Sequence, residues 1–180
     1  MADSVATRYA VALFEIAKEE DKVSFYKSEF NSFYSLLDDD VLSFLGHFSI
    51  PVEAKKDFLA KAFKGKLDQT IYNFVCLLLD KNRFNNIKEI VKEFNESCNQ
   101  YLGIEEGIIY SAVKLTSKEV EQIAQKVSKI IGKKTILTQR LDESLVGGFK
   151  VAVADKVIDN SLKNKLESLK SELLKEEVNS

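Results

Sequence analysis

The sequence predicts an α+β protein, with an N-terminal six-helix bundle followed by a small β-α-β-β-α C-terminal domain. Apolar residues recur at spacings of three and four through residues 5–102, which is the pattern of amphipathic helices. After Gly103 the chain changes to short segments rich in Ile, Val and Tyr, which favour strands. A length of 180 residues suffices for two small domains, and an apolar content of 45% suffices for packed cores. We place the boundary near Glu105, between domains 1–105 and 106–180.

Six helices are expected in the first domain, over residues 5–17, 23–37, 41–48, 53–63, 69–79 and 84–102. Ser4 is a capping residue before the first helix, and Pro51 lies in the first turn of the fourth. The first helix carries one apolar face, formed by Val5, Tyr9, Ala12, Leu13 and Ile16. The fifth is apolar nearly all round, as expected of a central helix, through Ile71, Phe74, Val75, Cys76, Leu77, Leu78 and Leu79.

The second domain is expected to contain strands over residues 107–115, 135–141 and 149–153. Thr116 and Glu119 have the spacing of a capping box, which opens a helix that ends at Gly132. Asp155-Lys156 is interpreted as a tight hairpin turn into Val157-Ile158. Asn160-Ser161 is expected to cap a final helix that carries Leu162, Leu166, Leu169 and Leu173.

The composition argues against a nucleic-acid binder and against a membrane-spanning protein. With 26 Lys and Arg against 28 Asp and Glu, the net charge of −2 creates no long-range attraction to polyanions. No segment approaches the run of about 20 apolar residues that a membrane span needs, and the start has no secretory leader pattern. Cys76 and Cys98 are too few to staple the chain and are expected to be buried thiols in a reducing compartment.

The inventory of reactive residues predicts no catalytic, cofactor or metal site. His47 is the only histidine, so a metal site based on imidazoles has no second ligand. Gly147-Gly148 lacks the Lys-Ser/Thr that follows in a phosphate-binding loop, and we interpret it as a turn or bulge before a strand. Function is therefore expected to depend on binding surfaces.

The first and fifth helices carry more apolar residues than a single inward face needs. If the two helices are neighbours, a small Ala beside bulky Leu and Val leaves a groove for the apolar side of a partner helix. This places a candidate binding groove at Tyr9, Ala12, Leu13, Val75, Leu78 and Leu79. The alternative is plain core packing.

Two stretches carry a family resemblance. One is Arg8-Tyr9-Ala10-Val11-Ala12-Leu13-Phe14-Glu15-Ile16-Ala17. The other is Asp142-Glu143-Ser144-Leu145-Val146-Gly147-Gly148-Phe149, continuing through Asp155-Lys156-Val157-Ile158-Asp159-Asn160-Ser161. Both resemble the δ subunit of bacterial ATP synthases, the homologue of the mitochondrial oligomycin-sensitivity-conferring protein, and Asn82-Arg83-Phe84 is a weaker match. The signature residues are Gly147, Gly148, Phe149, Asp155, Val157, Ile158 and Asp159. Ala154 and Asn160 depart from it where the family often has glycine.

The resemblance implies a stator subunit that catalyses nothing itself and binds no cofactor. It implies that the first domain takes an N-terminal helix of an α subunit into the groove between the first and fifth helices, and that the second engages b-type stalk subunits through the 149–180 region. No nucleic acid is implied, and contact with the membrane, at the cytoplasmic face of the bacterial plasma membrane, is indirect. The alternative from another class is a helical peptide-binding regulatory adaptor.

Overall fold

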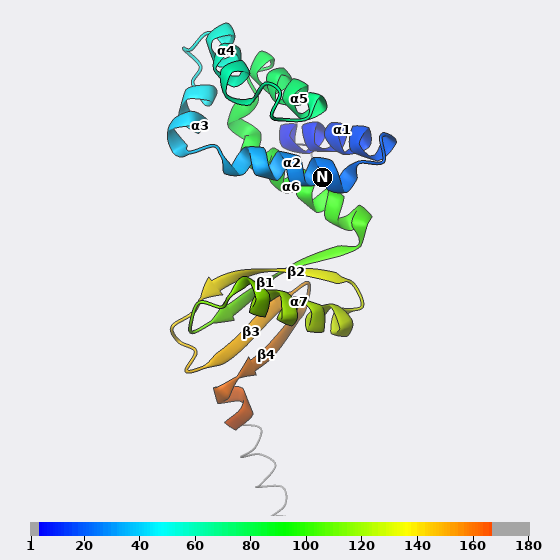
Figure 1. The fold of residues 1–180 in the computed structure, drawn as a ribbon, viewed down its shortest axis with the longest axis vertical. Coiled ribbons are helices and arrows are strands. Elements are labelled where there is room, and N and C mark those ends of the chain that lie inside the picture. The colour runs from blue at the N-terminus through cyan, green and yellow to red at the C-terminus, as the bar shows by residue number, and fades with distance from the viewer. Residues whose placement is uncertain (1–3, 167–180) are drawn as a thin grey trace, which may run out of the picture. The chain divides into compact units, whose positions relative to one another are not determined.

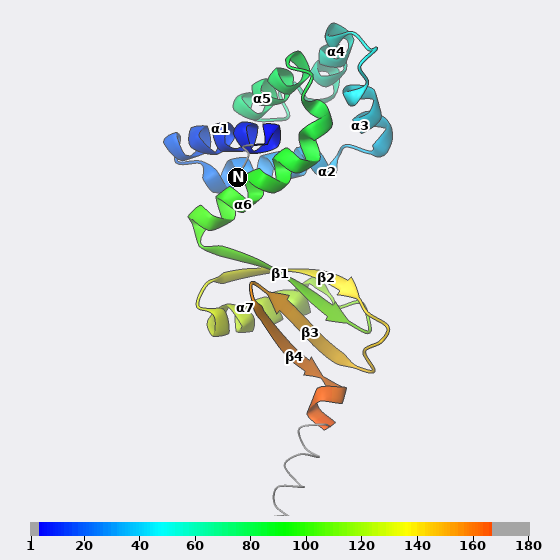
Figure 2. The same cartoon turned by 180° about the vertical axis from the view of Figure 1, so that it is seen from behind.

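The computed structural model describes residues 4–166, which divide into two units between Leu102 and Gly103. The first unit is helical and the second combines a helix with a sheet (Figures 1 and 2). The prediction of a protein of mixed helix and sheet is confirmed. The division falls just before the expected Glu105 because strand β1 already begins at Ile104.

The helical unit contains α1 (Val5–Glu19), α2 (Val23–Ser35), α3 (Asp39–Gly46), α4 (Val52–Phe63), α5 (Gln69–Asp80), the 3₁₀ turn η1 (Phe84–Asn86) and α6 (Ile87–Leu102). Side chains cap three of the helix starts, as Ser4, Asp38 and Asp68 accept hydrogen bonds from the backbone N–H groups two or three residues ahead. Several helix ends differ from expectation by one or two residues, as α1 extends to Glu19 and α2 ends at Ser35. The third helix ends at Gly46, because His47 is extended, and the sixth begins with a 3₁₀ turn.

The core of the helical unit is aromatic at its centre and small along α1. Phe30 contacts Phe74 and Phe94 edge to face, with ring centroids 5.6 and 5.7 Å apart. The face of α1 that packs on the rest of the unit is formed by Ala6, Ala10, Leu13 and Ala17, all buried. Small side chains let α1 approach α6 closely. Of the five residues that the sequence analysis placed on one apolar face of this helix, only Leu13 is buried.

The mixed unit contains β1 (Ile104–Ser111), α7 (Ser117–Ile131), β2 (Lys134–Leu141), β3 (Gly148–Val153) and β4 (Lys156–Ser161). The strand order is β2-β1-β3-β4, with β1 and β2 parallel and the other pairs antiparallel. Helix α7 connects the parallel pair and covers one face of the sheet, where Val127 packs with Ile109, Leu137 and Val151. The predicted capping box is present: Thr116 N donates to Glu119 Oε2 at 2.8 Å, and Glu119 N donates to Thr116 Oγ1 at 3.3 Å.

The β3–β4 hairpin corrects two predictions. Val153 pairs with Lys156, so the two-residue turn is Ala154-Asp155 and not Asp155-Lys156. Ala154 has φ of +51°, a left-handed conformation that favours Gly. Asn160 is an ordinary strand residue paired with Phe149, while Ser161 Oγ caps the next helix by accepting from Asn164 N at 3.3 Å. Leu162 and Leu166 lie in this helix, and Leu169 and Leu173 lie outside the described residues.

The first expected strand also has different bounds. Residues 104–111 form β1, whereas 112–116 leave the sheet and lead into α7. The sequence extended the strand to Leu115 because Val113 and Leu115 continue the alternation of apolar residues. Leu115 instead packs on the core of the mixed unit from the loop.

Candidate partner-binding groove

An open groove of about 330 Å³ lies between α1 and α5 of the helical unit. Both ribbon views show the two helices as neighbours (Figures 1 and 2). The groove is mostly apolar, and its lining consists of Val5, Arg8, Tyr9, Ala12, Leu13, Ile16, Phe74, Leu77 and Arg83.

The α1 wall is a second apolar face of that helix, next to the alanine face that packs inside the unit. Val5, Tyr9, Ala12 and Ile16 recur at spacings of three and four, which places them on one side of a helix. Ile16 is 38% exposed, although it is a large apolar side chain. Ala12 contributes only a methyl group between its larger neighbours, and this small side chain makes room in the wall.

The α5 wall is formed by Phe74 and Leu77. Tyr9 crosses to Phe74, with ring centroids 6.4 Å apart and the planes at 67°, so an edge-to-face contact forms part of the floor. Leu77 stays 41% exposed, whereas the leucine that follows it is fully buried. An exposed Leu on an otherwise central helix is available for contact with another molecule.

Three of the six residues nominated from the sequence line this groove, and three do not. Tyr9, Ala12 and Leu13 belong to the lining. Val75, Leu78 and Leu79 are at most 1% exposed and belong to the core of the helical unit. The sequence missed Phe74 and Leu77, because a helix that is apolar on every side gives no sign of which side meets the core.

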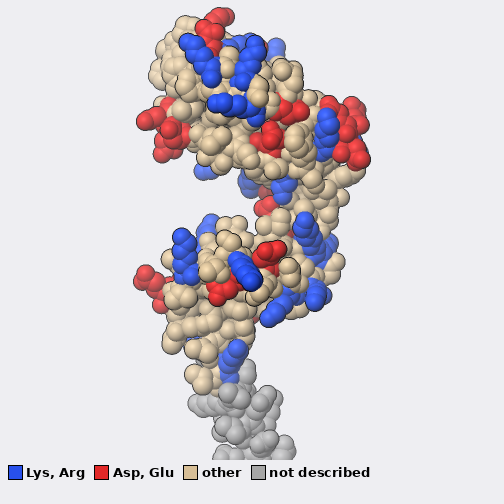
Figure 3. All heavy atoms as spheres, viewed as in Figure 1, with Lys and Arg blue, Asp and Glu red and all other residues tan. Residues whose placement is uncertain are grey.

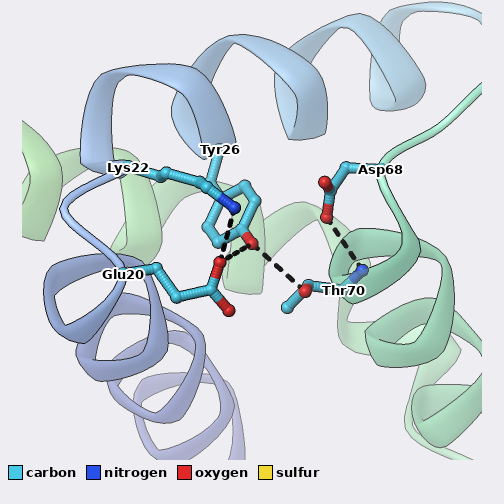
Figure 4. Close-up of polar contacts among 5 residues, drawn as sticks. All are labelled: Glu20, Lys22, Tyr26, Asp68 and Thr70. Carbon is cyan, nitrogen blue, oxygen red and sulfur yellow. Dashed lines mark hydrogen bonds and ion pairs between the residues drawn. The ribbon is translucent and has the colours of Figure 1, made fainter.

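A polar network lies outside the groove lining, where α1 ends and α5 begins (Figure 4). Tyr26 Oη donates to Glu20 Oε2 at 2.6 Å and lies 3.1 Å from Thr70 Oγ1. Lys22 Nζ donates to the same Glu20 oxygen at 2.8 Å, and Asp68 accepts from Thr70 N at 2.8 Å. The network therefore ties the α1–α2 turn to the start of α5 and fixes the spacing of the two walls.

The hydrogen bonds of this network shift the pKa values of Glu20 and Tyr26. The hydrogen bond from Lys22, followed by that from Tyr26, lowers the pKa of Glu20 below its ordinary value. Burial, followed by the Glu20 hydrogen bond, raises the pKa of the Tyr26 phenol. Tyr26 consequently stays protonated and remains a donor to the Glu20 carboxylate at neutral pH.

Two arginines stand at one end of the groove. Arg8 and Arg83 both line it, and within residues 4–166 neither side chain forms an ion pair or hydrogen bond. Elsewhere on the visible face of each unit, basic and acidic side chains both appear (Figure 3). The groove thus combines an apolar floor with two unpaired cations at one end.

The C-terminal signature residues serve the architecture of the mixed unit. Gly148 has φ of +79°, and a Cβ there would lie 2.4 Å from the Asn160 carbonyl oxygen, so only Gly fits beside β4. Gly147 is less constrained, since a Cβ there would lie 2.7 Å from Leu162 Cδ1, the end of a 49% exposed side chain that can move aside. Phe149 and Ile158 pack on the sheet core, and Asp155 is in the hairpin turn.

Asp159 completes this signature through a local contact. Its Oδ1 accepts from Ser161 N at 2.9 Å, and hydrogen bonding to Ser161 lowers the pKa of the carboxyl. Val157 points to the sheet face opposite α7 and is 61% exposed.

The mixed unit also has a groove of about 660 Å³ between α7 and β2, with Val120, Ala124 and Leu137 in its lining.

Neither metal-binding nor membrane-spanning features are found in residues 4–166. That range contains no group of three His, Cys, Asp or Glu side chains arranged to hold a metal ion. None of its helices combines the length and apolarity needed to cross a bilayer. Cys98 is buried, and burial raises the pKa of its thiol to about 12.

Comparison with known proteins gives matches over nearly the whole chain. The family model described as ATP synthase delta (OSCP) subunit matches residues 5–173. ATP synthase subunit delta of Halalkalibacterium halodurans is 33% identical over 174 residues, covering 95% of both chains. That of Acetivibrio thermocellus is 35% identical over 173 residues, covering 94% of this chain and 97% of the relative. A chain of the Toxoplasma gondii mitochondrial ATP synthase has the same fold, with a TM-score of 0.67 at 20% identity over 95% and 98% of the two chains.

Proposed function

Because the chain belongs to the ATP synthase delta (OSCP) subunit family, whose members are components of the peripheral stalk, we propose that it connects the catalytic head of an ATP synthase to the membrane sector. In this role it is a non-catalytic stator subunit, which prevents the head from turning with the rotor. It reaches the cytoplasmic face of the bacterial plasma membrane only through the complex. The helical unit, as a six-helix bundle, binds the head, and the mixed unit binds the stalk.

The observation that carries the proposal is the groove between α1 and α5. Its apolar lining and elongated walls suit an amphipathic helix that lays its apolar side between Tyr9, Ile16 and Leu77. Arg8 and Arg83 at one end favour a partner helix with carboxylates beside its apolar stripe. The partner is the N-terminal helix of an α subunit.

A stator joint has to bind tightly while torque acts on it. Stable protein pairs typically bury about 1,600 Å² in total, and a few apolar or aromatic anchors near the centre contribute most of the affinity. Tyr9, Phe74 and Leu77 are the side chains in the groove that meet this description. The Tyr26 network supports them, because it holds the two helices at a fixed spacing before the partner arrives.

For the mixed unit we propose the b-type stalk subunits as partners, through the 149–180 region. Three large apolar side chains in its described part are exposed, namely Val157 at 61%, Leu162 at 49% and Leu166 at 67%. Val157→Asp is expected to weaken copurification with b-type subunits. The same variant should still bind an α-subunit peptide, because the groove lies in the other unit.

Calorimetric titration of the full chain with a peptide of the α-subunit N-terminus, from the same organism, tests the proposal. We expect saturable one-to-one binding that Leu77→Asp abolishes. Leu36→Asp is the matched control, since Leu36 is 67% exposed and does not line the groove. If the folded protein does not bind this peptide, the alternative of a regulatory adaptor for other peptides is favoured. The family membership would then indicate the fold and not this partner.

A further inference from the structure

Lys55 on α4 is a buried lysine without a partner. The residue is 3% exposed, and its side chain forms no hydrogen bond or ion pair with any group in residues 4–166. Its neighbour in sequence is ordinary by comparison, as Lys56 Nζ lies 2.6 Å from Asp80 Oδ1. Lysines with so little exposed surface are rare unless the ammonium has a partner.

Lys55 lines a cavity of about 290 Å³. In residues 4–166, every side-chain nitrogen or oxygen that is fully enclosed has a hydrogen-bond partner. Lys55 Nζ has none, so this atom is not fully enclosed, and the cavity is the open space that adjoins the residue. The floor is apolar, because Leu45, Leu79 and Phe84 are at most 2% exposed. The cavity is several times larger than the roughly 30 Å³ that a water molecule occupies in the liquid.

Two amides line the same cavity and are not engaged elsewhere. Asn82 lies two residues after the end of α5, with φ of +51°, and Asn85 lies in η1. Neither side chain makes a hydrogen bond within the described part of the chain. Asn85 Oδ1 lies against Gly46, where a Cβ would be 2.0 Å from it, so the absence of a side chain at Gly46 makes room for this amide.

The charge balance of the cavity is one-sided. Its lining contains one ammonium and two amide groups that offer N–H donors, and it contains no carboxylate. Phe48 also lines the cavity and is 90% exposed, and the His47 ring stacks on it with ring centroids 5.3 Å apart. A negatively charged group that enters would exchange its water for a charge-assisted hydrogen bond from Lys55 and neutral ones from the amides.

We infer that this cavity binds a small oxyanion, a carboxylate or a phosphate, with Lys55 as its countercharge and Asn82 and Asn85 as donors. The site is separate from the α1–α5 groove, with which it shares no lining residue. The Asn82-Arg83-Phe84 turn lies between the two sites, since Arg83 lines the groove while Asn82 and Phe84 line the cavity.

Nuclear magnetic resonance titration of the full chain with inorganic phosphate, and separately with acetate, tests the inference. Ionic strength is held constant with sodium chloride, and the side-chain amide signals of Asn82 and Asn85 are followed. We expect saturable shifts with at least one anion, and the two titrations decide between a tetrahedral and a planar ligand. Lys55→Met, which keeps the apolar stem, is expected to raise the apparent Kd at least tenfold. Lys61→Met, an exposed lysine of the same helix, is expected to leave it unchanged.

Thermal unfolding provides a second measurement. The anion that binds should raise the Tm of the wild type and of Lys61→Met but not that of Lys55→Met. If Lys55→Met does not fold, Lys55→Arg should retain binding and Asn85→Ala should weaken it. Should neither anion give saturable shifts in the wild type, the inference is wrong, and Lys55 only places a hydrated cation near the C-terminal end of α3.

Discussion

Leu77 and Leu78 are adjacent in sequence but have opposite surroundings, and truncating each to Ala should separate binding from stability. Leu→Ala removes three carbons, worth about 0.8 kcal/mol each when fully buried. Since 41% of Leu77 is exposed in the free protein, a partner that covers this part gains about 1 kcal/mol of binding free energy. Losing it in Leu77→Ala corresponds to about a five-fold increase in Kd. Leu78 is fully buried, so its truncation should lower the free energy of unfolding by about 2–5 kcal/mol.

The two quantities are measured on the same samples. Urea unfolding followed by circular dichroism gives the stability of each variant, and calorimetric titration with the α-subunit peptide gives its Kd. We expect Leu77→Ala to lose less than about 1.5 kcal/mol of stability, because 41% of the residue is already exposed in the free protein and only the covered part contributes. The reasoning is refuted if Leu77→Ala binds the peptide as the wild type does, or if both variants lose the same stability.

Three further predictions concern the mixed unit. Ala154→Gly should raise the free energy of unfolding by up to about 1 kcal/mol, because Gly relieves the left-handed φ of +51° at some cost in chain entropy. The urea midpoint should rise with it, and a lower midpoint would contradict this. Gly148→Ala should lower the free energy of unfolding by more than about 1 kcal/mol, since its Cβ would lie 2.4 Å from the Asn160 carbonyl oxygen, and an unchanged midpoint would show that the strand shifts freely. Hydrogen bonds from Thr116 lower the pKa of Glu119 below its ordinary 4.5, so its carboxylate stabilises α7 fully above pH 4.5 and ceases to do so as the pH falls through the folded-state pKa. The stability difference between wild type and Glu119→Ala, measured against pH, should therefore shrink on acidification, and a growing difference would reverse the sign of this argument.

The local parts of the fold were predictable from short-range signals. Ser4, Asp68 and the Thr116–Glu119 box mark helix starts through bonds to backbone groups within three residues, so their chemistry is complete in the sequence. The hairpin turn was misplaced by one residue, because an Ala in the left-handed conformation is not a turn signal. Strand pairing, and not turn propensity, sets that register.

The groove was predictable in its location but not in all of its residues. The excess of apolar residues on the first and fifth helices indicated the two helices that border the groove, and Tyr9 and Ala12 line it as expected, while their role in partner binding stays a prediction. On α5 the nominated Leu78 and Leu79 are core residues, and Leu77 is the exposed one. The mean apolarity of a helix does not show which of its residues are buried and which are exposed.

By itself, the sequence determined the helices and strands, the change of character at Gly103, and the family, because caps, periodicity and the glycine signature act over short distances along the chain. The tertiary structure decided which side of each apolar helix faces solvent, and it brought Lys55, Asn82 and Asn85 from separate elements around one cavity. The physical reason is that burial is a property of the packed assembly. A side chain is enclosed or exposed according to neighbours that are distant in sequence, and no local pattern specifies them.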